Sequence, residues 1–181
     1  MIPLPHQIPS RRVGGFTLIE LLVVIAVIAI LASLILSTAG FVQEKGARSR
    51  IEVEIAALDT ALESYKVDNG DYPEADGGNT SSKELITALM PKNGKVYFEI
   101  SGKMLNNPTD PWSAANFLVD AFGNPYHYYY DATDPVPDNN PVTQSQNNGP
   151  TFFDLWSTGK RTTKPGNLTD EQWRAQWIKN W

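Results

Sequence analysis

A single carboxylate, Glu20, stands near the start of a long apolar run and is the side chain of this protein best placed to do chemistry. From Phe16 to Phe41 it is the only strongly polar side chain. An ionisable group inside an apolar segment is energetically expensive, and its presence therefore indicates a function. The chemistry it offers is charge pairing, because a carboxylate left unpaired in a low-dielectric medium costs several kcal/mol.

The rest of the chain offers no catalytic constellation. It has two histidines, of which His6 lies near the N-terminus and His127 stands among tyrosines, so no Ser/His/Asp arrangement can be built. It has no cysteine, which excludes disulfides and zinc sites of the Cys/His type. The net charge of −5 argues against a nucleic-acid partner, since phosphate binding needs clustered basic side chains. We expect a protein that is not an enzyme.

The apolar run that holds Glu20 is long enough to cross a membrane. Residues 16–40 are dominated by alanine, leucine, isoleucine and valine and contain no proline. A bilayer core needs roughly 20 such residues in a helix. The basic pair Arg11-Arg12 precedes the run and favours a cytoplasmic location for the N-terminal segment. The sequence therefore predicts a single transmembrane helix.

Four other interpretations of the same run are possible. A buried helix of a soluble protein would need a core that covers it on every side. A secretory signal peptide, with a weak cleavage site at Ser37-Thr38-Ala39, usually has an apolar region of only about 7–15 residues. A twin-arginine signal lacks its apolar pair, because Gly14-Gly15 occupies that place. An uncleaved N-terminal anchor remains an alternative.

A second, amphipathic helix is predicted over residues 41–69. Apolar side chains recur there at steps of four and three and form one stripe: Ile51, Ile55, Leu58, Leu62 and Tyr65. Asn69-Gly70 is a good stop signal, because glycine tolerates the left-handed conformation that ends a helix. Joined to the apolar run, this gives one helix of roughly 50 residues. We interpret the stripe as the core-facing side of an extracytoplasmic domain.

Residues 70–181 carry the signals of a small sheet, so the predicted fold class is α+β, with a long helix packed on an antiparallel sheet. We expect a glycine-rich loop at 75–80, a short helix to Met90 opened by a Ser81–Glu84 capping box, strands at 95–100, 126–130 and 152–159, and a long loop at 135–150.

The C-terminus predicts one more helix, with a Thr169–Gln172 capping box, that runs to about Asn180. Its tryptophans, Trp173, Trp177 and Trp181, are spaced by four and would share one face. Such a row can bind sugars or a partner. More often it buries apolar area against its own domain, and we favour that packing.

The junction Gly14-Gly15-Phe16-Thr17-Leu18-Ile19-Glu20 resembles the class III signal of type IV pilins and type II secretion pseudopilins. Residues 65–73, Tyr-Lys-Val-Asp-Asn-Gly-Asp-Tyr-Pro, resemble the signature of the major pseudopilin. Residues 118–128 and 152–159 are similar to two further stretches of that family, although Ala121 and Phe122 replace its proline and tryptophan.

The resemblance implies a domain organisation. Residues 1–15 would be a leader that a prepilin peptidase removes after Gly15, and the new Phe16 amine would be N-methylated. Residues 16–40 would form a single-pass helix in the inner membrane that also serves assembly through Glu20. Residues 41–181 would form a periplasmic domain with a pilin-like fold.

The resemblance also implies a function and partners. The chain would be a structural subunit of a type II secretion pseudopilus that polymerises with itself to drive protein export. Its other partners would be the minor pseudopilins, the inner-membrane secretion platform and the membrane, with no nucleic acid. A type IV pilin and a membrane-anchored glycan-binding domain remain alternatives.

A calcium site is the point where the chain departs from this family. Pseudopilins of the major type commonly follow the last strand with Gly-Ala-Asp-Gly, whose loop helps to hold calcium, whereas this chain has Gly159-Lys160-Arg161-Thr162. Calcium prefers six to eight oxygen ligands, several of them carboxylates. Asp154 and Asp170 remain as candidate metal ligands. We expect no cofactor, with calcium as the alternative.

Overall fold

The computed structural model describes residues 15–130 and 153–180, without the side chains of 35–39. These residues belong to two compact units, Met1–Val42 and Gln43–Trp181. Helix α1 (Leu18–Asn69) contributes to both. The predicted leader, apart from Gly15, and the predicted loop at 135–150 lie outside the described residues.

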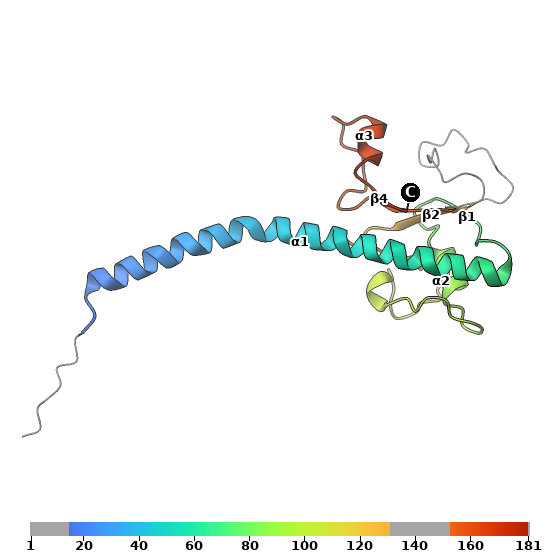
Figure 1. The fold of residues 1–181 in the computed structure, drawn as a ribbon, viewed down its shortest axis with the longest axis horizontal. Helices are drawn as coiled ribbons and strands as arrows, with labels where there is room; N and C mark the ends of the chain where they lie inside the picture. Colours follow the sequence, from blue (N-terminus) through green and yellow to red (C-terminus); the bar gives the residue numbers. More distant parts are fainter. Residues whose placement is uncertain (1–14, 131–152, 181) are drawn as a thin grey trace, which may run out of the picture. The chain divides into compact units, whose positions relative to one another are not determined.

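The second unit combines helices with a four-stranded sheet, which confirms the predicted α+β class (Figure 1). After α1 the chain forms β1 (Ala75–Asp76), α2 (Lys83–Leu89), a 3-10 turn (Gly102–Met104), β2 (Tyr126–Tyr130), β3 (Asp154–Ser157), α3 (Asp170–Arg174) and β4 (Ile178–Lys179). The strands lie in the order β1-β2-β3-β4, and every neighbouring pair is antiparallel.

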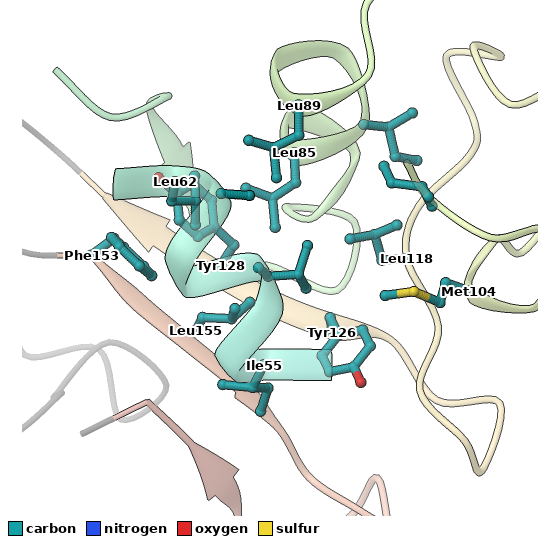
Figure 2. Close-up of a cluster of buried hydrophobic side chains, with 14 of the residues drawn as sticks. Ile55, Leu62, Leu85, Leu89, Met104, Leu118, Tyr126, Tyr128, Phe153 and Leu155 are labelled. Carbon is teal, nitrogen blue, oxygen red and sulfur yellow. The ribbon is translucent and has the colours of Figure 1, made fainter. Parts of the chain in front are cut away.

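One face of the sheet packs on the predicted stripe of α1. Ile51, Ile55, Leu58 and Leu62 are each at most 3% exposed, and Tyr65 is half-buried. Their partners come from α2 and from alternate positions of the strands, and Figure 2 shows them as one cluster that includes Leu85, Leu89, Tyr126, Tyr128, Phe153 and Leu155. The spacing of the stripe thus predicted the core side of the helix correctly.

The predicted helix stop is also confirmed. Gly70 has a φ angle of +90°, which glycine adopts without strain. The side-chain amide of Asn69 donates to the Tyr65 carbonyl at 2.9 Å and to the Tyr97 hydroxyl at 3.1 Å. Asn69 and Gly70 therefore end α1 and attach its last turn to the loop after α2.

The opposite face of the sheet is buried as well, under aromatic rings. His127 of β2 lies opposite Trp156 of β3, and the two rings stack at 5.1 Å between centroids. Trp177 also stacks on Trp156, with 5.8 Å between the ring centroids. Burial lowers the pKa of His127 below its ordinary value, so the imidazole is neutral at pH 7.

Three local predictions between residues 75 and 100 were wrong. Residues 75–76 form β1 instead of loop, because they pair with Tyr129 and Tyr130. Residues 95–100 are not a strand, since the Tyr97 and Phe98 amides both bond to the Leu89 carbonyl at the end of α2. The Ser81–Glu84 capping box is absent: α2 begins at Lys83, and the Ser81 hydroxyl bonds to Gly78 and Tyr128 instead.

The C-terminal helix begins as predicted but is shorter. Thr169 and Gln172 form the expected reciprocal capping box. The helix ends at Arg174 and not near Asn180, because Ile178 and Lys179 pair with β3 as strand β4. The Ile178 side chain is 6% exposed, and its burial stabilises this strand pairing.

Candidate functional site

The predicted processing and assembly residues lie at the start of α1. Gly15 and Phe16 are exposed, and α1 begins two residues later at Leu18. Glu20 accepts hydrogen bonds from the Thr17 amide at 2.9 Å and the Thr17 hydroxyl at 2.8 Å. In return, the Glu20 amide donates to the Thr17 hydroxyl at 3.3 Å.

This reciprocal pattern is a capping box, which the sequence analysis missed. The signal was present, since Thr17-x-x-Glu20 directly precedes an apolar run. It gives Glu20 a role within one chain, because its carboxylate satisfies an amide that the first helical turn leaves without a partner. Glu20 therefore has a local role in addition to any role in assembly.

The helix that follows presents apolar side chains on every side. From Phe16 to Leu34, all the described side chains are exposed. Among the residues that the structure describes, no helix satisfies both the length and the apolarity needed to cross a membrane. Residues 35–39 of the predicted span have side chains outside that description.

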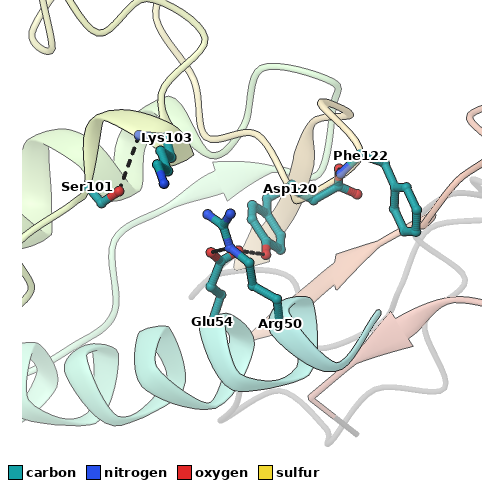
Figure 3. Close-up of polar contacts among 7 residues, drawn as sticks. Arg50, Glu54, Ser101, Lys103, Asp120 and Phe122 are labelled. Carbon is teal, nitrogen blue, oxygen red and sulfur yellow. Dashed lines mark hydrogen bonds and ion pairs between the residues drawn. The ribbon is translucent and has the colours of Figure 1, made fainter. Parts of the chain in front are cut away.

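Asp120 is a buried, hydrogen-bonded carboxylate that was not predicted from sequence as a site residue. It is 3% exposed, and one carboxylate oxygen accepts from the amides of Phe122 and Asn124 at 2.8 and 2.9 Å. The other oxygen accepts from the Ser157 hydroxyl at 2.5 Å. Asp120 thereby fixes the turn into β2 and joins it to the end of β3. The aspartate of the turn motif at 118–128 therefore has a structural role, and Figure 3 shows it beside Phe122.

A second polar group connects α1 to the same region. Glu54 accepts from Arg50 Nε at 2.7 Å and from the Tyr126 hydroxyl at 2.7 Å (Figure 3). Burial, together with the bond to Glu54, raises the pKa of Tyr126, so the phenol remains protonated. The group ties the helix to β2 and contains no nucleophile–base pair.

We predict that Asp120→Asn changes how stability depends on pH. Burial raises the pKa of Asp120 above its ordinary 3.8, so the folded protein holds this proton more tightly than the unfolded chain. Its contribution to stability is therefore greatest below pH 4 and falls as the pH rises through the folded pKa. Asparagine can still accept from the two amides, but it has no charge to bury. We expect Asp120→Asn to gain stability relative to the parent between pH 4 and 7 in urea unfolding.

The control for this prediction is Asp110→Asn, because Asp110 is exposed. Its stability should follow the parent at every pH. The quantity to compare is the free energy of unfolding of Asp120→Asn minus that of the parent. If this difference is the same at pH 4 and at pH 7, the buried carboxylate does not titrate in this range.

The two candidate metal ligands lie in different settings. Asp154 is buried at the start of β3, whereas Asp170 is exposed at the start of α3. Asp170 pairs with Lys164 at 2.6 Å, and this bond lowers the pKa of its carboxyl. Within residues 15–130 and 153–180, no group of three or more His, Cys, Asp or Glu side chains is placed to hold a metal ion.

The described part of the tryptophan row packs against its own domain. Trp173 is 7% exposed, and Trp177 stacks on Trp156. The rings of Trp173 and Trp177 meet edge to face, with 6.3 Å between their centroids. Trp181 lies outside the described residues. The favoured interpretation of the row as packing therefore holds for Trp173 and Trp177, although Trp177 follows α3 and is not part of it.

Comparison with known families adds two matches. Residues 10–36 match the family described as "Prokaryotic N-terminal methylation motif". Residues 41–174 match "Type II secretion system (T2SS), protein G". The first match covers Gly15, Phe16 and Glu20, and the second covers most of the compact unit that holds the sheet.

Several curated relatives are called type II secretion system core protein G. The protein from Pseudomonas aeruginosa is 30% identical over 94% of this chain and 96% of its own length. The protein from Escherichia coli K12 is 37% identical over 68% of this chain and 81% of its own length. No solved structure matches the chain significantly. With its methylation motif and its protein G domain, this chain belongs to the type II secretion system protein G family, the major pseudopilins.

Proposed function

We propose that this chain is a structural subunit of a type II secretion pseudopilus and that its polymerisation drives protein export. The observation that carries the proposal is the arrangement at the start of α1, where Gly15 and Phe16 are exposed and Glu20 stands one turn further on. Membership of the protein G family supports the same function. The partners would be further copies of this chain, the minor pseudopilins and the inner-membrane secretion platform.

Maturation would take place at the membrane. A prepilin peptidase would cut after Gly15, and the new Phe16 amine would be methylated. Residues 16–40 would insert in the inner membrane as a single span, with the domain from residue 41 onward in the periplasm. The exposed apolar side chains from Phe16 to Leu34 support insertion, because such a surface is unfavourable in water.

Assembly would use Glu20 as the partner of a neighbour's Phe16 amine. In the single chain, the carboxylate is held by Thr17, in bonds of 2.8 and 2.9 Å. Its exposed position leaves further acceptor capacity, since a carboxylate has about four lone-pair sites. Charge pairing would set the register between neighbouring helices, and apolar packing would supply most of the attraction.

We propose that the protein works without a metal and without catalysis. A chelator should therefore leave the melting temperature of the purified protein unchanged, because Lys160 and Arg161 place two positive charges in the loop after β3, and these would repel a calcium ion. Circular dichroism with and without EDTA, at constant ionic strength, measures this. A clear loss of stability on chelation, restored by added calcium, would support a calcium site at Asp154 or Asp170.

Gly15→Leu tests the maturation step. A Cβ atom at position 15 would meet no described atom within 4 Å, and Gly15 precedes α1, so we expect the substitution to leave the fold intact. We expect the full-length chain to accumulate in the membrane, with no filaments. The matched control is Gly46→Ala, which is also sterically free but lies within α1 and should be processed normally. Mature protein of normal size from Gly15→Leu would contradict cleavage at this position.

A further inference from the structure

A cavity of about 390 Å³ lies between the start of the second unit's helix and the loop after β3. Its polar wall is formed by Glu44 and Arg48 of α1 and by Thr158, Lys160 and Arg161 of the loop. The Trp173 ring closes one side. The proposed assembly function uses none of these side chains.

The charge of the cavity is strongly positive. Three cations, Arg48, Lys160 and Arg161, surround a single carboxylate, Glu44, in a chain whose net charge is −5. Glu44 is already paired with Lys160, at 2.9 Å. The bond to Lys160 and then the nearby guanidinium groups lower the pKa of Glu44. Two positive charges therefore remain without a compensating acid in the cavity wall.

The structure holds the donors of this cavity in place. Arg48 donates to the Gln176 carbonyl at 3.2 Å, which fixes its guanidinium beside the loop. Gly159 starts the loop with a φ angle of +68°, and its carbonyl is bonded by the Asn124 amide at 2.7 Å. Within the part of the chain that is described, no acid lies within ion-pair distance of Arg161, and the buried Thr158 hydroxyl has no hydrogen-bond partner.

We infer that this cavity binds a phosphate group, held by Arg48, Lys160 and Arg161. Guanidinium groups bind phosphate oxygens through two parallel bonds, and a lysine adds a point charge. A phosphate offers more acceptor oxygens than a carboxylate does, which suits a wall with three cationic side chains and a hydroxyl.

The phosphate has two possible sources, a phospholipid headgroup and free phosphate. Glu44 and Arg48 follow Phe41, the last residue of the apolar run, by only three and seven positions. If residues 16–40 span the membrane, this part of the chain leaves the bilayer where the headgroups lie. A lipid headgroup can be the ligand only if residues 16–40 insert in the membrane as proposed. The phosphate site itself does not depend on that insertion.

The test uses the full chain in a neutral detergent and follows thermal unfolding. Sodium phosphate should raise the melting temperature more than sodium chloride or sodium acetate at the same ionic strength, because a ligand stabilises the state that binds it. In the double variant Arg48→Gln/Arg161→Gln, the apparent affinity for phosphate should fall by about tenfold or more, as expected from the loss of charge-assisted bonds. Arg161→Gln alone should weaken binding and leave the fold intact, since Arg161 is exposed.

Vesicles distinguish the two sources. If the source is a lipid, phosphatidylcholine vesicles that contain phosphatidylglycerol should stabilise the parent more than pure phosphatidylcholine vesicles, and the double variant should lose this difference. Stabilisation by phosphate alone would support the site with free phosphate as its ligand. The matched control Lys103→Gln removes an exposed cation from the 3-10 turn and should behave like the parent.

Three results would overturn the inference: no stabilisation by either source, an equal effect of acetate, which would indicate a partner's carboxylate, or an equal loss of affinity in Lys103→Gln. The detergent arm requires neither cleavage nor assembly. Its failure would therefore count against the phosphate site alone, whereas normal processing of Gly15→Leu would count against the proposed function.

Discussion

Replacing Glu20 with leucine is expected to leave a cleaved, membrane-inserted chain that forms no filaments. Cleavage should continue, because the proposed cut between Gly15 and Phe16 lies upstream of Glu20. Insertion should continue, because leucine is favourable within a membrane helix. Assembly should fail, because the Phe16 amine of a neighbour would lose its buried partner and the register of the helices would no longer be specified.

The capping box makes the choice of control important. Leucine removes both the charge of Glu20 and its bonds to Thr17, which are 2.8 and 2.9 Å long. Glu20→Gln keeps an oxygen that can accept from Thr17 but removes the charge. If charge pairing drives assembly, Glu20→Gln should fail as Glu20→Leu does. If the residue serves only to cap α1, Glu20→Gln should assemble like the parent.

The measurement compares mature protein in the membrane with subunits in sheared filaments. Glu20→Asp shortens the reach of the carboxylate by one methylene and should assemble in part. Filaments from Glu20→Leu as abundant as those of the parent would show that the carboxylate does not determine assembly.

Trp173→Ala should lower the free energy of unfolding by about 3–5 kcal/mol, the range for a large aromatic side chain removed from a core. Trp173 is 7% exposed and contacts Trp177, which in turn stacks on Trp156 of β3. Loss of the Trp173 ring would open a cavity near Trp177 and Trp156, on the face of the sheet opposite α1. Urea unfolding of residues 42–181, which we expect to be soluble and folded, measures the change.

The matched control is Trp112→Ala. Trp112 is 38% exposed, and its indole donates to the Met90 carbonyl at 2.8 Å. We expect a loss of no more than about 1–2 kcal/mol, mainly from this hydrogen bond and the partly covered ring. A Trp173→Ala variant as stable as the parent would contradict packing and favour a row that binds a partner.

The parts of the fold that sequence predicted are those with strong local patterns. The stripe from Ile51 to Leu62 repeats with the helical period, so the core side of α1 follows from spacing alone. Tyr126–Tyr130 is a run of aromatic residues after a turn, and it forms β2 as expected. The Thr169–Gln172 capping box was predicted because all of its atoms belong to four consecutive residues.

The missed parts depend on partners that are distant in sequence. Strand β1 exists because Ala75 pairs with Tyr130, and β4 exists because Ile178 pairs with Ser157. Two residues carry too little pattern to predict a strand without knowledge of the partner. The Ser81 hydroxyl likewise accepts from the Tyr128 amide, 47 positions away, and does not cap α2.

The same contrast between local patterns and distant partners holds for the candidate sites. Gly15, Phe16 and Glu20 could be proposed from sequence because they lie in one short motif, which the methylation-motif family match also covers. Asp120 was missed because one of its partners, the Ser157 hydroxyl, belongs to β3 and is 37 positions away in sequence. The phosphate cavity joins Glu44 to Lys160 across 116 positions, and no local pattern could have brought them together.

The most direct test of the account is the mass and the N-terminal residue of subunits recovered from sheared filaments. We expect a chain that begins at Phe16 and carries one methyl group on its amine. Cleavage after Gly15, methylation and assembly would then be established on the same molecules. Filament subunits that begin at Met1, or a membrane chain that begins near Gly40 and never enters filaments, would contradict it.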